Sequence, residues 1–364
     1  MNVIDNYIIE NELYFKKLEY NKSSKFVEIK VPNTELKFKF DENHIKKLEN
    51  HELLAEIKTL KHYKHYGFSY KNYAEFFVVD KNVFNVIYGD ESNLNIDLKF
   101  NIGKYIIEFN TVSSFCCLLI EPYYSLKSEA ICDKGLTEYF DTIKILNAPM
   151  DKHEEILIQA IYYLNTHFYK SKDISFSVFN LNFDFESYEK KDFTTSGIIG
   201  QESKELSNFK HIEPLILYLE ACKQEIDAFM GFYRIIEFFW NIVLERELKT
   251  IRYKTSITEK KIIKLLNNRR EKDLLRLLLN RVLSNEIKEK IINYLKNNDI
   301  IKENTFDSFC VGLYKYRNSI VHSKENKKQS MKMSGVFGNI GKEYKAWLRI
   351  TKYVAECCIN QFNR

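Results

Sequence analysis

Two side chains near the C-terminus have types and spacing suited to chemistry on a phosphate group. Arg317 and His322 are separated by four residues, and Asn318 directly follows the arginine. A guanidinium carries a fixed positive charge in a planar fork that fits phosphate oxygens. Imidazole titrates near neutral pH, so it can act as general base or general acid. These residue types suit metal-independent cleavage of RNA, whose own 2′-hydroxyl is the nucleophile.

The residues around Arg317 place it within an apolar stripe. Spacings of three and four residues put the following apolar side chains on one face of a helix: Phe306, Phe309, Cys310, Leu313, Ile320 and Val321. A guanidinium turned toward a core costs on the order of several kcal/mol unless it is paired. We therefore expect Arg317 to meet a carboxylate, to line a cleft or to lie in a subunit contact.

Helical geometry separates the two candidate catalytic side chains. Arg317 and His322 are five positions apart, which is roughly 140 degrees around an ideal helix. They converge only if the helix ends or distorts near Ser323, or if a two-fold partner contributes its own copy. This favours a homodimer.

The bare spacing has simpler explanations. A histidine near a helix end commonly caps carbonyl groups, and an arginine on an apolar stripe commonly pairs with a buried carboxylate. The context of the motif is what distinguishes these alternatives from a catalytic site.

That context is a run that reads Tyr316-Arg317-Asn318-Ser319-Ile320-Val321-His322-Ser323-Lys324. It resembles the signature of the HEPN superfamily (higher eukaryotes and prokaryotes nucleotide-binding), in which an Arg, often followed by Asn, precedes a His near a helix end. A long helix carrying Phe232-Tyr233-Arg234-Ile235-Ile236-Glu237-Phe238-Phe239 lies upstream, as in many bacterial members. The resemblance covers roughly residues 210 to 364.

The resemblance implies an all-helical homodimer whose Arg317 and His322 line a shared cleft that cuts RNA without metal, with Asn318 as companion. Some members carry a Tyr two residues beyond the His, where this chain has Lys324. This departure leaves open a non-catalytic RNA- or nucleotide-binding helical dimer module.

A second set of polar residues interrupts the apolar stretch from Ile226 to Leu244. Their spacing forms one narrow stripe on the predicted helix: Asp227, Arg234, Glu237, Asn241 and Glu245. The stripe either faces the cleft, with Glu237 and Arg234 supporting Arg317 or His322, or it is the solvated face of a bundle helix. All ten arginines lie at or after Arg234, in the half of the chain that carries the motif.

Periodicity divides the chain into two predicted domains, 1–200 and 208–364. The second reads as a helical bundle with helices over 214–249, 258–283, 286–296, 305–324 and 341–362. The first reads as a β-rich α+β domain with a sensing or regulatory role. Its antiparallel strands include 26–31, 36–40, 96–100 and 174–183, and its helices cover 43–62 and 151–168.

Composition places the chain among globular proteins and gives no sign of a cofactor. The formal charge of +5 permits a nucleic-acid partner without indicating one. The seven cysteines contain no Cys-x-x-Cys pair, so we expect reduced thiols and neither metal nor other cofactor. The first residues lack the pattern of a secretory signal and the longest apolar run, 115–120, is too short for a membrane span, so we expect a cytoplasmic protein.

Together these patterns predict a metal-independent endoribonuclease acting through a dimeric Arg and His site. The HEPN resemblance alone implies that it is the effector of a bacterial antiviral defence or toxin system, with an unknown trigger or regulator at the N-terminal domain. Neither the RNA target nor the trigger follows from the sequence.

Overall fold

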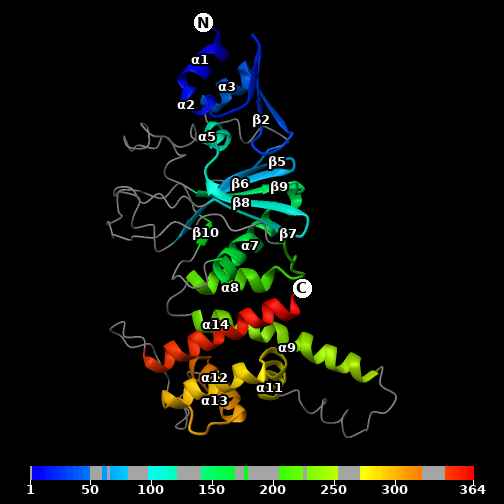
Figure 1. Ribbon diagram of the computed structural model, residues 1–364, viewed down its shortest axis with the longest axis vertical. Helices are drawn as coiled ribbons and strands as arrows, with labels where there is room; N and C mark the ends of the chain where they lie inside the picture. The colour runs from blue at the N-terminus through cyan, green and yellow to red at the C-terminus, as the bar shows by residue number, and fades with distance from the viewer. Residues whose placement is uncertain are drawn as a thin grey trace. The chain divides into compact units, whose positions relative to one another are not determined.

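The computed structural model describes residues 2–49, 60–63, 66–80, 97–120, 141–168, 176–178, 205–223, 228–252, 271–321 and 341–364. The chain forms two compact units, Met1–Asn208 and Phe209–Arg364. The architecture is mixed α+β, with sheets that are antiparallel apart from one short parallel pair, followed by a set of helices (Figure 1). This agrees with the fold class that the periodicity predicts.

The N-terminal unit begins with a small layer of three helices and a three-stranded sheet. Its elements are α1 (Val3–Glu10), α2 (Glu12–Phe15), β1 (Tyr20–Lys22), β2 (Phe26–Lys30), β3 (Lys37–Asp41) and α3 (Glu42–Glu49). Alternation along β2 and β3 buries Val27, Ile29, Phe38 and Phe40, as expected for half-buried antiparallel strands.

A larger antiparallel sheet follows, with strand order β11-β7-β8-β9-β6-β5-β4 and with β10 paired to β6. Its strands are β4 (Leu60–His62), β5 (Gly67–Tyr70), β6 (Tyr73–Asp80), β7 (Leu98–Ile102), β8 (Tyr105–Thr111), β9 (Asp141–Leu146), β10 (Phe176–Val178) and β11 (Glu205–Leu206). The predicted strands 96–100 and 174–183 correspond to β7 and to β10, whose neighbours 169–175 and 179–200 lie outside the described residues.

Helices pack on both faces of this sheet (Figure 1). One is α5 (Ser114–Ile120), in which every residue is buried. On the other face lie the turn η3 (Met150–Lys152), α7 (His153–Tyr163) and the π-helical segment η4 (Leu164–Phe168). The predicted helix 151–168 is confirmed, whereas α5 is not among the predicted helices.

The predicted helix over 43–62 is wrong at its end. Helix α3 stops at Glu49, and Leu60–His62 form strand β4, while 50–59 lie outside the described residues. Leu60 is buried opposite Tyr70 on the neighbouring strand. Sheet pairing therefore determines the conformation of this segment, against its helical pattern.

The regular secondary structure of the C-terminal unit is helical wherever the structure describes it. It contains α8 (Glu213–Lys223), α9 (Ala228–Arg252), α11 (Glu271–Val282), α12 (Asn285–Asn297), α13 (Phe306–Val321) and α14 (Lys342–Phe362). The predicted helix 214–249 corresponds to α8 and α9, between which residues 224–227 lie outside the described part. Of the predicted helix 258–283, only α11 is described.

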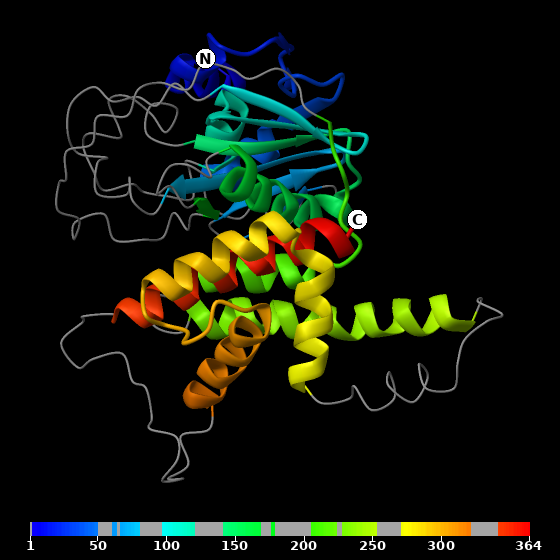
Figure 2. The same ribbon diagram turned by 60° about the horizontal axis from the view of Figure 1, so that its bottom comes forward.

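Helix α9 is the centre of this unit, because α8, α11 and α14 all pack against it (Figure 2). Its contact with α8 is close at Gly231, where an added Cβ would lie 2.6 Å from the Cβ of Ala221. Helix α13 packs against α11 and α12. The arrangement brings the predicted Arg317 helix within reach of α9.

Candidate functional site

Arg317 lies on α13, whose packed face is defined by apolar side chains. Thr305 caps the start of the helix, with its Oγ1 accepting from the backbone N–H of Ser308 at 3.1 Å. The buried side chains of the helix are Phe309, Cys310, Leu313, Tyr316 and Ser319. The predicted apolar stripe is confirmed in its middle part only, because its first and last members are not buried. Phe306 and Ile320 are half-buried, and Val321 is 42% exposed.

The guanidinium of Arg317 binds a carboxylate of another helix. Its Nη2 donates to Oε1 of Glu237 on α9 at 2.8 Å, and its Nη1 donates to Oδ1 of Asn318 at 3.0 Å. The side chain of Arg317 is 13% exposed and that of Glu237 is 26% exposed. The expected partner of a guanidinium on an apolar stripe is therefore present.

A second carboxylate approaches the same guanidinium more loosely. Oε2 of Glu271, at the start of the described part of α11, lies 3.5 Å from Arg317 Nη1, and this side chain is 48% exposed. The same oxygen accepts a long hydrogen bond of 3.4 Å from the hydroxyl of Tyr314. Two carboxylates thus face one arginine.

An aromatic ring from α9 supports the arginine. The guanidinium carbon of Arg317 lies 5.7 Å from the ring centroid of Tyr233, within the range of a cation–π interaction. Burial raises the pKa of the Tyr233 hydroxyl above its usual value, an effect that the positive charge of Arg317 partly opposes. The phenol is therefore neutral and able to donate a hydrogen bond.

Two buried donors in this cluster have no acceptor. Neither the Tyr233 hydroxyl nor Arg317 Nε meets a hydrogen-bond partner among the residues that the structure describes. A buried donor without a partner costs roughly 1–3 kcal/mol. The packing of the cluster therefore leaves these two donors unsatisfied.

The other predicted site residues are distributed unevenly. Asn318 adjoins Arg317, as described above, whereas His322 and Asp227 lie outside the described residues. Arg234, Asn241 and Glu245 are exposed. Among the described members of the predicted polar stripe, only Glu237 contacts Arg317. The other three described members form a solvated face of α9. The structure thus does not bring Arg234 to Arg317.

Sequence reasoning missed Glu271, Tyr233 and Tyr314 as members of the cluster. Tyr314 precedes Arg317 by three residues, a spacing that places both on one side of a helix and offers a usable signal. Glu271 comes from another helix, and its approach depends on how α11 packs on α13.

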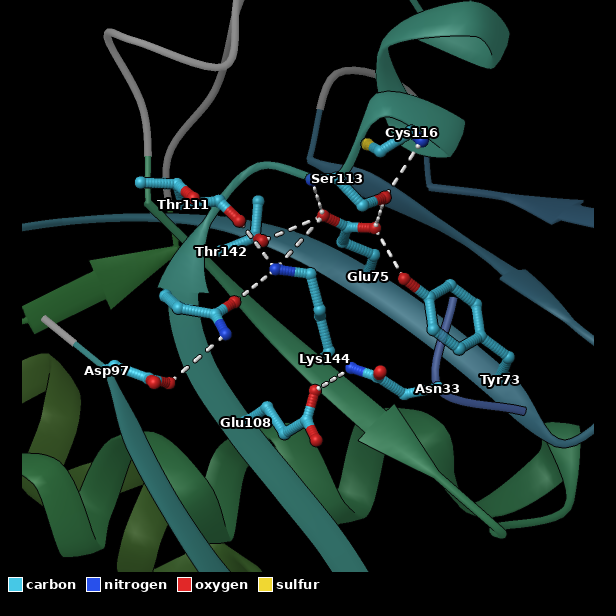
Figure 3. A network of polar contacts seen from close by, with 11 residues as sticks. Asn33, Tyr73, Glu75, Asp97, Glu108, Thr111, Ser113, Cys116, Thr142 and Lys144 are labelled. Atoms are coloured by element: carbon cyan, nitrogen blue, oxygen red, sulfur yellow. Dashed lines mark hydrogen bonds and ion pairs between the residues drawn. The ribbon is translucent and has the colours of Figure 1, made fainter. Parts of the chain in front are cut away.

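A second polar cluster lies in the N-terminal unit and surrounds a fully buried carboxylate (Figure 3). Glu75 on β6 accepts from the Tyr73 hydroxyl at 2.6 Å, from the backbone N–H and hydroxyl of Ser113 at 2.8 and 2.5 Å, and from the Thr142 hydroxyl at 2.8 Å. Lys144 Nζ lies 3.7 Å from Glu75 Oε1. The same Nζ donates to the Thr111 carbonyl and to the Asn110 side chain.

Glu75 ends a row of alternating charges that crosses the sheet. Directly paired positions on β7, β8, β9 and β6 are Lys99, Glu108, Lys144 and Glu75. Lys99 donates to Glu108 at 2.8 Å. Asn33 donates to the other oxygen of Glu108 at 2.6 Å (Figure 3). Opposite charges on neighbouring strands stabilise this pairing.

This row is structural rather than chemical in character. Both oxygens of Glu75 are saturated by donors, and Ser113 Oγ also accepts from the Cys116 backbone N–H at 3.0 Å, which caps α5. Burial raises the pKa of the Cys116 thiol well above its ordinary value. The Glu75 carboxylate, through Ser113, anchors α5 to the sheet, and the buried Cys116 thiol beside it is unreactive.

Neither a metal-binding cluster nor a membrane-spanning helix occurs among the residues that the structure describes. Within the described ranges no three His, Cys, Asp or Glu residues are grouped so that they could hold a metal ion. None of the helices in that part of the chain combines the length and hydropathy of a membrane span. The Arg317 cluster is consequently the candidate site.

Comparisons with protein-family models, with curated proteins and with solved structures gave no match to this chain.

Proposed function

We propose that this protein is a metal-independent endoribonuclease whose catalytic groups are Arg317 and His322, with Asn318 as their companion. The observation that carries the proposal is the orientation of Arg317. Glu237 fixes one edge of its guanidinium, Tyr233 lies below it and Asn318 holds Nη1. A charge held in advance in this way stabilises a transition state without reorganisation during the reaction.

The chemistry needs a base, an acid and positive charge. The base takes the proton from the ribose 2′-hydroxyl while the 2′-oxygen forms a bond to phosphorus and the bond from phosphorus to the 5′-oxygen breaks. The acid gives its proton to the departing 5′-oxygen. His322 supplies the acid and base functions, and Arg317 neutralises charge on the phosphate oxygens. The upstream product ends in a 2′,3′-cyclic phosphate, and the downstream product begins with a 5′-hydroxyl.

A homodimer through the C-terminal unit assembles this site. Two copies of His322 divide the acid and base roles, which resolves the angular separation of Arg317 and His322 on one helix. Val321, at the described end of α13, is one of five large apolar side chains that are exposed in the described part of the chain, at 42%. In the proposed dimer a partner subunit covers Val321.

The N-terminal unit senses a trigger or holds the nuclease inactive in this proposal. The protein acts on RNA in the cytoplasm as the effector of a bacterial antiviral defence or toxin system. This role extends the HEPN resemblance of residues 210 to 364.

A non-catalytic RNA- or nucleotide-binding helical dimer is the second candidate function. Lys324 favours it, because some HEPN ribonucleases carry a Tyr at the corresponding position. In that case Arg317→Ala and His322→Ala weaken RNA binding, and neither the wild-type protein nor any variant cuts RNA.

Incubation of purified protein with RNA in excess EDTA tests the proposal. We expect cleavage by the wild-type protein, and its loss by roughly a hundredfold or more in Arg317→Ala and His322→Ala. Arg349→Ala is the control, since Arg349 is an exposed arginine on α14. Undiminished cleavage by His322→Ala would remove the proposed mechanism, and RNA binding without cleavage by any variant would favour the second candidate.

A further inference from the structure

Arg317 holds its three neighbouring acceptors with unequal strength. Nη2 donates to Glu237 at 2.8 Å, whereas Nη1 is shared between Asn318 at 3.0 Å and Glu271 at 3.5 Å. Glu271 is also the most exposed of the charged groups, at 48%. Exposed ion pairs contribute little to stability. Glu237 is therefore a fixed partner, and Glu271 is one that can leave.

The oxygen of Glu271 marks a point where two donors of α13 converge. Oε2 lies 3.5 Å from Arg317 Nη1 and 3.4 Å from the Tyr314 hydroxyl. Tyr314 and Arg317 are three residues apart and so project from the same side of the helix. A guanidinium and a phenol that meet at one anionic oxygen form a site that suits a phosphate oxygen equally well.

The charge balance determines when such an anion can bind. With Glu237 and Glu271 both beside Arg317, one positive and two negative charges are close together. A phosphate is repelled by this set, and removal of the Glu271 carboxylate brings it to neutrality. Once Glu271 leaves, Arg317 Nη1 and the Tyr314 hydroxyl are the two donors that face the vacated position.

We propose that Glu271 occupies the place of an RNA phosphate in the ligand-free protein, and that the Tyr314 hydroxyl and Arg317 bind that phosphate once Glu271 withdraws. This inference rests on the proposed function and adds a phosphate-binding residue, Tyr314, and a competing carboxylate to it. Glu237 stays with Arg317 throughout and positions it.

Binding of a fluorescein-labelled single-stranded RNA, measured by anisotropy in EDTA, tests this inference. All proteins carry His322→Ala so that no RNA is cut. Glu289→Gln is the control for Glu271→Gln, because Glu289 is an exposed glutamate on α12 and its replacement removes the same charge. Tyr294→Phe is the control for Tyr314→Phe, because Tyr294 is also half-buried.

We expect Glu271→Gln to lower the Kd roughly two- to fivefold relative to Glu289→Gln, since it removes a weak competing ion pair. Tyr314→Phe raises the Kd roughly tenfold relative to Tyr294→Phe, since it removes a hydrogen bond to a charged acceptor. The Tyr314→Phe effect persists in the Glu271→Gln protein, because the hydroxyl binds RNA rather than Glu271. Circular dichroism and thermal unfolding verify that each variant is folded.

The outcomes separate this inference from the proposed function. If Arg317→Ala abolishes RNA binding while Glu271→Gln matches Glu289→Gln, or Tyr314→Phe matches Tyr294→Phe, the displaced-carboxylate inference is overturned and the nuclease proposal stands. If the parent protein binds no RNA, or binds it equally well with Arg317→Ala, both are overturned.

Discussion

Arg317 and Glu237 contact each other across 2.8 Å although they are 80 positions apart in the sequence. The contact joins α13 to α9, the helix around which the C-terminal unit is packed. It fixes the guanidinium before any substrate arrives. The ion pair thus connects the packing of the helices with the orientation of the proposed catalytic group.

This ion pair should contribute measurably to stability. In a double-mutant cycle with Arg317→Met and Glu237→Gln, urea denaturation should give a coupling free energy of about 1–2 kcal/mol. The matched control is the pair Arg276 and Asp307, which meets at 3.1 Å with both side chains more than half exposed. Its coupling should stay below about 1 kcal/mol. Equal coupling in both cycles would show that burial does not strengthen the Arg317 pair.

Glu75 should be necessary for the stability of the N-terminal unit. Glu75→Leu leaves Lys144 without its counter-ion and removes the acceptor of the Tyr73, Ser113 and Thr142 hydroxyls. We expect a loss of about 3–5 kcal/mol in the free energy of unfolding. Addition of Lys144→Met should restore part of it, because no unpaired charge then remains buried.

Glu154→Leu is the control for this variant, since Glu154 is an exposed residue of α7. A Glu75→Leu protein that unfolds at the same urea concentration as Glu154→Leu would contradict the structural role of the network.

His153 should make the protein less stable in acid. It is fully buried, its Nε2 donates to the Ala148 carbonyl at 2.8 Å, and burial lowers the pKa of its imidazole to about 4. Between pH 6.5 and 4 the unfolded chain binds a proton that the folded protein does not. The free energy of unfolding therefore decreases as the pH is lowered through this range. The contribution reaches about 3 kcal/mol.

Asp141 acts in the opposite direction over part of this range. Burial raises the pKa of its carboxyl to about 6, so between pH 6 and 4 the folded protein is the form that binds the extra proton. Comparison of the wild-type protein with His153→Gln, in urea at pH 7 and pH 4.5, cancels this effect. The wild-type protein should lose more stability on acidification; identical losses would contradict the assignment.

The sequence predicted the elements whose pattern reflects burial on one face. Val27, Ile29, Phe38 and Phe40 alternate with polar residues because β2 and β3 each cover one side of a core. The same rule failed for the central strands. Glu75 and Lys144 look like solvent-facing positions in the sequence, yet both side chains are buried in the structure. Their burial depends on the pairing of β6 with β9, which is distant in the sequence and which no local pattern encodes. Helix α5 is buried all round, so it carries no period to recognise.

The candidate site was predictable to a similar extent. The spacing around Arg317 predicted a carboxylate partner, a cleft or a subunit contact, and the polar interruption of the α9 stretch offered Glu237 as one such carboxylate. Arg234 belonged to the same stripe and faces solvent instead, because the packing of α9 turns only part of that stripe toward α13. Glu271 depends on the placement of α11, which no local pattern encodes.

The exposed apolar side chain of Val321 should lie in the proposed dimer contact. Val321→Glu should lower the dimer affinity, measured by sedimentation, and should make RNA cleavage depend more steeply on protein concentration. Folding stability should change little, since the side chain is exposed. Ile9→Glu, at an exposed position of the N-terminal unit, is the control. A dimer with the same affinity in both variants would contradict a contact at Val321.

The ends of RNA cut in excess EDTA test the central claim most directly. Mass spectrometry of the products should show 2′,3′-cyclic phosphate and 5′-hydroxyl ends, no cleavage where the ribose is replaced by 2′-deoxyribose, and no product with His322→Ala. Products with 3′-hydroxyl and 5′-phosphate ends, or the same products from His322→Ala, would contradict the account.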